Sequence, residues 1–138
     1  MSVDLVRISE NRVVLLDGAW GTELQKNGLK PGELPELLNV ENPEAVKAVA
    51  RAYTAAGAEM LLTNSFGANP LILREKGLEK EAGRISETAA RLSREGAAEA
   101  GKSESLIVGS IGPSGRVVMT EPGGEDVFYA AFREQAMG

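Results

Sequence analysis

Three short apolar runs recur along the chain, and each is followed by a segment with helical character. The runs lie near residues 12–16 (RVVLL), 59–63 (EMLLT) and 106–110 (LIVGS). Runs rich in leucine and β-branched residues are typical of strands that are buried on both faces. Strands that alternate with helices in this way favour a parallel sheet with right-handed crossovers. The sequence therefore predicts an α/β chain with parallel strands and three β/α units.

The helical segments begin and end at characteristic residues. Asn42, Pro43 and Glu44 predict a helix start, because asparagine caps a helix, proline suits its first position and glutamate favours its positive end. Gly57 predicts the end of this helix, since glycine readily adopts the left-handed conformation that terminates helices. Further helices are expected over residues 22–27, 70–76, 80–100 and 125–137.

The charge balance of the chain excludes some classes of partner. Its 138 residues include 15 Lys and Arg against 20 Asp and Glu, for a formal net charge of -5. No basic block is present, so nucleic acid is not an expected partner. No apolar run approaches the roughly 18 residues that suggest a membrane span, and the N-terminus lacks the features of a signal peptide. We therefore expect a cytoplasmic protein with no membrane partner.

The chain contains no cysteine and no histidine. This excludes disulfides, thiolate metal ligands, and imidazole as a general base or metal ligand. Any chemistry must use carboxylates, hydroxyls, amides, backbone groups or the residues of a partner. We accordingly assign no catalytic residue and no metal ligand to this chain.

Each predicted strand ends in small or polar residues. Asp17-Gly18-Ala19 follows the first run, Thr63-Asn64-Ser65 ends the second, and Gly109-Ser110 ends the third. The C-terminal ends of parallel strands meet at one edge of a sheet, where ligands bind in such folds. We therefore expect a small polar ligand at this edge, held by one carboxylate and several backbone groups.

Each of these features also has a structural interpretation. Asp17 is suited to cap the helix that follows, Thr63 to form a turn with its polar neighbours, and Phe66 to lie in the core. The glycine-rich stretch 109–115 does not fit a phosphate-binding loop, because its spacing is not GxGxxG and Pro113 lacks a backbone donor.

Four segments resemble the homocysteine S-methyltransferase family, which includes the homocysteine-binding domain of cobalamin-dependent methionine synthase and betaine-homocysteine methyltransferase. They are LLDGAWGTELQ, NVENP, LLTNSFGAN and VGSIGPSG, in this order. The resemblance covers nearly the whole chain. It implies that residues 1–138 are a partial homocysteine-binding domain, the N-terminal half of a (β/α)8 TIM barrel with strands near 12–16, 59–63 and 106–110. The implied reaction is methyl transfer to the homocysteine thiolate, which gives methionine.

The resemblance also implies where the substrate binds. In the family, homocysteine lies at the C-terminal face of the strands, and three cysteines hold a zinc ion that keeps its sulfur deprotonated. The strand-one carboxylate is then expected to face the ammonium group of the amino acid. Ser110 falls where many members carry aspartate. The substrate-binding residues implied for this chain are Asp17, Gly18, Ala19, Thr63, Phe66 and Ser110.

A barrel of this type needs roughly 250 residues, and the zinc-binding cysteines of the family lie in its second half. We therefore expect the isolated chain to be inactive without a Cys-bearing C-terminal half. Three arrangements stay open: a fragment of a longer enzyme, a split subunit completed by a second polypeptide, or a self-associating chain. The methyl donor also stays open, with cobalamin- and folate-linked donors both compatible. The alternative function is a non-catalytic α/β half-barrel that serves as a binding or assembly module.

Overall fold

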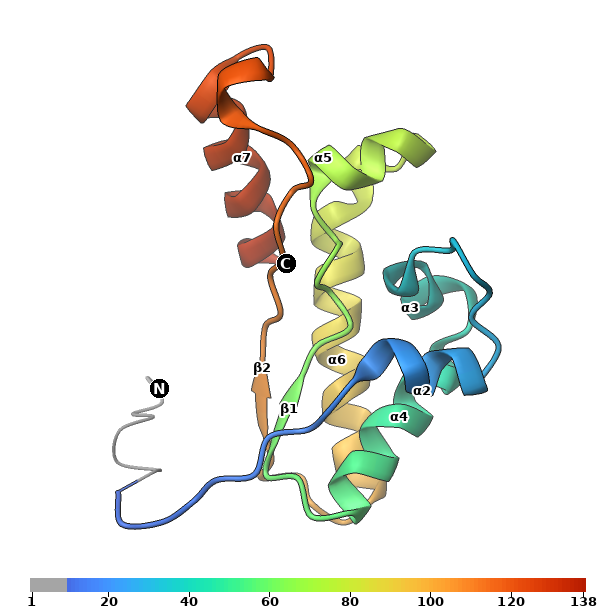
Figure 1. The fold of residues 1–138 in the computed structure, drawn as a ribbon. Helices are drawn as coiled ribbons and strands as arrows, with labels where there is room; N and C mark the ends of the chain where they lie inside the picture. The colour runs from blue at the N-terminus through green and yellow to red at the C-terminus, as the bar shows by residue number, and fades with distance from the viewer. Residues whose placement is uncertain (1–9) are drawn as a thin grey trace.

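The computed structural model describes residues 10–138 (Figure 1). Residues 1–9, on which the expectation of no signal peptide partly rests, lie outside the described residues. The described helices and strands are α2 (Trp20–Lys26), α3 (Leu38–Glu41), α4 (Pro43–Ala55), β1 (Met60–Leu62), α5 (Pro70–Leu73), α6 (Ala82–Glu99), β2 (Leu106–Val108) and α7 (Gly124–Met137), with single 3-10 turns at Pro35–Leu37, Arg74–Lys76, Glu79–Glu81 and Val118–Thr120.

The sheet contains two parallel strands. β1 pairs with β2 in the register Met60 to Leu106 through Leu62 to Val108. In Figure 1 both strands point toward the end of the molecule where α5 lies. β1 matches the central residues of the predicted run at 59–63, and β2 matches the first three residues of the run at 106–110. The α/β class and the parallel direction of the strands are confirmed.

The predicted strand at 12–16 is reduced to one parallel bridge between Leu16 and Met60. Leu15 accepts the N–H groups of both Glu59 and Met60, at 2.9 and 3.1 Å, and no regular ladder continues from there. Leu15 and Leu16 are 54% and 51% exposed. Among the described residues, no further strand pairs with the edge of the sheet that these two residues form. Three complete β/α units are therefore not confirmed.

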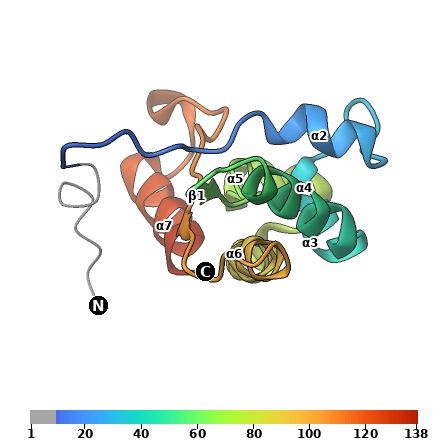
Figure 2. The same cartoon turned by 90° about the horizontal axis from the view of Figure 1, so that it is seen from below.

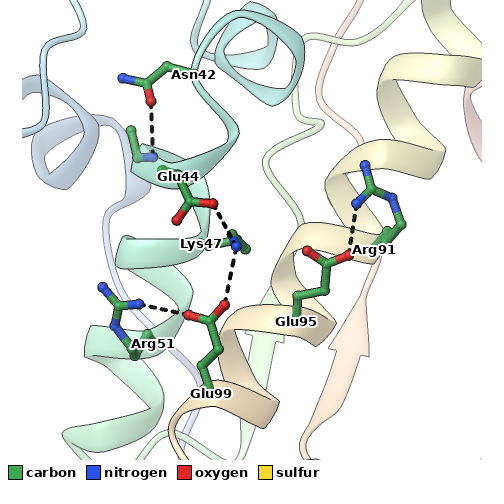
Figure 3. Close-up of polar contacts among 8 residues, drawn as sticks. Asn42, Glu44, Lys47, Arg51, Arg91, Glu95 and Glu99 are labelled. Carbon is green, nitrogen blue, oxygen red and sulfur yellow. Dashed lines mark hydrogen bonds and ion pairs between the residues drawn. The ribbon is translucent and has the colours of Figure 1, made fainter.

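Helices α4 and α6 pack closely beside the sheet. Figures 1 and 2 show α2 and α4 on the side of β1 that faces away from β2. Gly96 of α6 lies against α4, where a Cβ atom would come within 2.7 Å of both Ala50 Cβ and the Lys47 carbonyl oxygen. Glu99 of α6 reaches across to Lys47 at 3.2 Å and Arg51 at 2.7 Å (Figure 3). The missing side chain at Gly96 thus lets the two helices approach.

The predicted helix boundaries agree well with the structure. The Asn42 side chain accepts the N–H of Ala45 at 3.4 Å, which confirms it as the cap of α4. Gly57 and Gly77 follow helical segments with φ of 111° and 70°, the left-handed conformation expected for glycine at these ends. No helix within residues 10–138 has the length and apolar character needed to cross a membrane.

The core lies between the helices and the sheet. Its largest cluster joins α2, α4 and α6, with partly buried Trp20 and Tyr53 packed against it. Leu61 of β1 is fully buried in a second cluster. Helix α6 buries the face predicted from its spacing, namely Ile85, Ala89, Leu92 and Gly96. This packing holds the C-terminal ends of the strands in place.

Candidate functional site

A cleft of about 420 Å³ lies at the C-terminal end of β1. Segments far apart in the sequence line it: the loop after Leu16, the stretch Leu34–Glu36, the end of β1 with its following loop, and Ser110 beyond β2. This is the position that parallel α/β folds use to bind ligands. We therefore treat this cleft as the candidate site.

Four of the predicted substrate-binding residues line the cleft: Gly18, Thr63, Phe66 and Ser110. The structure thus brings together residues from all three predicted strand ends. Asp17 and Ala19 adjoin the cleft in sequence but are not among the residues that line it. The Ala19 carbonyl oxygen instead accepts the hydroxyl hydrogen of Tyr53 at 3.0 Å. Contact of these residues with a substrate stays a prediction.

Asp17 connects the first loop to the sheet. Its Oδ2 atom accepts the indole Nε1–H of Trp20 at 2.7 Å and the backbone N–H of Leu62 at 2.9 Å. Its Oδ1 atom is buried and has no hydrogen-bond partner. Burial raises the pKa of Asp17, and the two hydrogen bonds partly oppose that rise. Asp17 does not cap α2, whose N-cap residue is Ala19 and has no side-chain cap bond, so that alternative was wrong.

A hydroxyl network joins the loops after β1 and β2. Ser65 Oγ donates to the Ser110 carbonyl oxygen at 2.8 Å, which uses its single hydrogen. Thr63 Oγ1, at 2.6 Å from Ser65 Oγ, must therefore be the donor in that contact. The same Thr63 oxygen accepts the N–H of Ser110 at 2.9 Å. Thr63 and Ser65 are both buried, so this network fixes the relative position of two cleft-lining segments.

The structural interpretation of Phe66 placed its side chain in the core, and this was wrong. Its side chain is 57% exposed, and its ring rests against Gly112. A Cβ atom on Gly112 would lie 2.5 Å from a ring carbon, and the Gly112 N–H donates to the Phe66 carbonyl oxygen at 2.9 Å. The ring is therefore an exposed apolar surface at the cleft, and the absence of a side chain at Gly112 leaves room for it in this position.

Sequence reasoning missed Glu36, which also lines the cleft. Only 4% of Glu36 is exposed, and its Oε1 atom accepts the backbone N–H of Gly67 at 2.7 Å. Burial raises the pKa of Glu36, and the bond from Gly67 partly offsets this effect. The available signal was a lone carboxylate between Leu34-Pro35 and Leu37-Leu38.

The segment that carries Glu36 is tied to the loop after β1 by two asparagines. Asn39 Nδ2 donates to the Asn64 carbonyl oxygen at 2.8 Å, and Asn64 Nδ2 donates to Asn39 Oδ1 at 2.9 Å. Asn64 Nδ2 also donates to the Pro35 carbonyl oxygen at 2.8 Å. Because these groups are buried and paired, the position of Glu36 in the cleft wall is well determined.

The donor set of this chain does not fit a thiolate-held zinc ion. The sequence contains neither cysteine nor histidine. Within residues 10–138, no group of three Asp or Glu side chains is placed to hold a metal ion either. The described site offers a ligand hydrogen-bonding groups, one carboxylate and an aromatic face.

Comparisons with known proteins agree on one family. The profile described as homocysteine S-methyltransferase matches residues 14–138. Methionine synthase from Mycobacterium tuberculosis (strain ATCC 25618 / H37Rv) is 29% identical over 143 aligned residues, and that from Mycobacterium leprae (strain TN) is 28% identical. Both alignments cover 98% of this chain and 12% of the relative, so the chain spans about an eighth of these proteins.

Two solved structures have a similar fold. The metallated form of the homocysteine methyltransferase MmuM from Escherichia coli superposes with a TM-score of 0.77 and 27% identity, over 96% of this chain and 51% of that one. Its oxidized form gives a TM-score of 0.70 and 30% identity, over 82% of this chain and 42% of that one. Because the family profile spans nearly all of the described residues, this chain belongs to the homocysteine S-methyltransferase family.

Proposed function

We propose that this chain forms part of the homocysteine-binding site of a methyltransferase that methylates the homocysteine sulfur to give methionine. The observation that carries the proposal is the convergence of Gly18, Thr63, Phe66 and Ser110 on one cleft. These residues come from the ends of all three predicted strands, and the family resemblance assigns each of them to the substrate. Family membership supports the substrate class.

We further propose that the chain is the N-terminal half of a (β/α)8 barrel. The support is that 96% of this chain superposes on only 51% of the metallated MmuM structure. The exposed apolar side chains of Val13, Leu15 and Leu16, which are 81%, 54% and 51% exposed, lie at the unpaired edge beside β1. A further barrel strand would pair with this edge and cover these side chains.

The role of this chain in the reaction is to bind and orient the substrate. A thiol with a pKa of about 8.5 is mostly protonated at neutral pH, and only its thiolate is an effective nucleophile. The described residues that line the cleft include no cysteine, histidine or lysine that would keep the thiol deprotonated. We assign that task to a Cys-bearing C-terminal half, supplied by the same polypeptide or by a second one.

Complementation tests the proposal. The chain is purified alone and together with a Cys-bearing C-terminal half from a family member, and each sample is incubated with homocysteine and a methyl donor used by that member. Methionine, measured by mass spectrometry, is expected only in the mixture. It is expected to disappear when the cysteines of the added half are replaced by serine.

The second hypothesis, a non-catalytic binding or assembly module, predicts a different result. Native mass spectrometry would then show a discrete oligomer that is unchanged by homocysteine, and the mixture would form no methionine. This combination of results would overturn the proposed function.

A further inference from the structure

The turn that carries Phe66 forms part of the cleft wall. The Ala68 N–H donates to the Ser65 carbonyl oxygen at 3.0 Å, which places Phe66 and Gly67 at the two central positions of the turn. Both central residues line the cleft. Because Phe66 is 57% exposed, packing in the core does little to fix the direction of its ring. The groups that hold the backbone of this turn therefore decide where the ring points.

Gln135 of α7 holds this turn from outside the cleft. The residue is 3% exposed, and its Nε2 atom donates to the Ser65 carbonyl oxygen at 2.7 Å. The same nitrogen lies 3.5 Å from the Phe66 carbonyl oxygen. Gln135 is not among the residues that line the cleft, and with Ser65 it lines a separate cavity of about 230 Å³ between β2, α6 and α7. Helices α7 and α4 lie on opposite sides of the strands (Figures 1 and 2).

Backbone groups at both ends fix the direction of the bonds that Gln135 makes. The Leu71 N–H at the start of α5 is a donor, so Asn69 accepts it through Oδ1, at 3.0 Å. The Asn69 Nδ2 group then donates to Gln135 Oε1 at 3.1 Å. This leaves Gln135 Nε2 for the Ser65 carbonyl oxygen, which can only accept. Asn69 is fully buried, so this chain of three bonds satisfies one orientation of the two amides.

We propose that Gln135 is a positioning residue for the substrate, which keeps the Phe66 ring directed at the cleft through its hold on the Ser65 carbonyl oxygen. This inference rests on the proposed function and gives α7 a role in it, 70 residues away in sequence from that carbonyl. Without the Gln135 amide, the Ser65 carbonyl oxygen keeps, among the described residues, only the bond from Ala68. The turn is then free to tilt, and the exposed ring moves with it.

A double-mutant cycle tests whether Gln135 acts through Phe66. Gln135→Met keeps an unbranched side chain of similar length and removes both amide hydrogen bonds. Glu134→Met places the same residue at the exposed neighbouring position and serves as the matched control. Each substitution is made in the wild type and in Phe66→Leu, and binding of L-homocysteine to the 138-residue chain is measured by isothermal titration calorimetry. Circular dichroism identifies a temperature at which each variant is folded.

The two backgrounds are expected to respond differently. In the wild type, Gln135→Met should weaken binding by about fivefold or more, and Glu134→Met should leave it unchanged. In Phe66→Leu, Gln135→Met should weaken binding by less than about twofold, because the ring is no longer there to be misplaced. A purely structural role would weaken binding equally in both backgrounds. If L-homocysteine binds only after the Cys-bearing half is added, the same ratios are expected in the KM of that mixture for L-homocysteine.

A second measurement needs no substitution, and it decides the question if Gln135→Met does not fold. The chain contains two glutamines, the buried Gln135 and the exposed Gln25. In the 15N-labelled wild type, L-homocysteine is expected to shift the NMR signals of the Gln135 side-chain amide and to leave those of Gln25 unchanged. Neither glutamine lines the cleft, so a shift at Gln135 reports the turn that it holds.

Several outcomes overturn the inference. If Gln135→Met weakens binding equally in both backgrounds or not at all, or if the Gln135 signals do not respond to L-homocysteine, Gln135 does not position Phe66. The proposed homocysteine site still stands in each of these cases. If L-homocysteine does not bind the wild type and complementation gives no methionine, both the inference and the proposed function fail.

Discussion

The backbone N–H of Leu62 donates to Oδ2 of Asp17 at 2.9 Å, across 45 residues of sequence. This bond joins the loop after the Leu16 bridge to the last residue of β1. The same oxygen holds the indole of Trp20, so a single carboxylate atom links the first loop, α2 and the sheet. Asp17 therefore has a clear structural task beside any contact with the substrate.

Replacing Asp17 by alanine should leave the Leu62 N–H and the Trp20 Nε1–H without an acceptor. We expect the free energy of unfolding to fall by about 1–3 kcal/mol. The Asp17→Asn variant keeps one acceptor oxygen, so its free energy of unfolding should fall by less. Urea denaturation followed by fluorescence measures this, because Trp20 is the single tryptophan. An alanine variant as stable as the wild type would show that these bonds contribute nothing net.

Glu36 should make stability depend on pH. Burial raises its pKa above the usual 4.5, so the folded chain holds this proton more tightly than the unfolded chain. The contribution of such a group is complete below its unfolded pKa and is lost as pH rises through the folded pKa. Glu36→Gln removes this loss, so its stability relative to the wild type should increase as pH rises above 4.5.

Urea midpoints between about pH 4 and about pH 7 measure this difference, and Glu41→Gln is the control that should run parallel to the wild type. Asp17 also has a pKa raised by burial. Its contribution to the pH dependence of stability is the same in the wild type, Glu36→Gln and Glu41→Gln, so it cancels in the comparison. A difference between Glu36→Gln and the wild type that stays constant with pH would contradict the prediction.

Thr63→Val should disrupt the hydroxyl network at the strand ends. Valine has nearly the same shape but cannot accept the Ser110 N–H or donate to Ser65. We expect a loss of about 1–3 kcal/mol in the free energy of unfolding, with Thr63→Ser close to the wild type. Hydrogen exchange at the Ser110 amide should accelerate in the valine variant alone. Equal exchange in both variants would argue against the network.

Two glycines of α6 should respond in opposite ways to alanine. At Gly96, the new Cβ atom would lie 2.7 Å from Ala50 Cβ and from the Lys47 carbonyl oxygen, so Gly96→Ala should destabilise the chain by about 1–3 kcal/mol. At Gly83, the nearest atom is 3.9 Å away, so Gly83→Ala should be neutral or stabilising by up to about 1 kcal/mol. Thermal unfolding of the pair measures the difference. Comparable effects at both positions would refute the close packing of α4 and α6.

The local chemistry of the sequence was sufficient to predict the longer helices α4, α6 and α7, whereas the short helix α3 was not predicted. Asn42 caps α4 as expected, and the spacing of Ile85, Ala89 and Leu92 identified the buried face of α6. These features depend on residues within one or two helical turns of each other. The strand-like run at 12–16 was less informative, because a strand needs a partner along its edge and this run pairs only at Leu16.

Sequence motifs by themselves determined the family of this protein and pointed to four residues that line its cleft, namely Gly18, Thr63, Phe66 and Ser110. Tertiary structure decided which carboxylate lines that cleft. Asp17 is held by Leu62, and Glu36 is buried against Gly67, 31 residues away. The burial and pairing of a carboxylate depend on segments that meet only in the folded chain, so the pattern around either residue could not distinguish their roles.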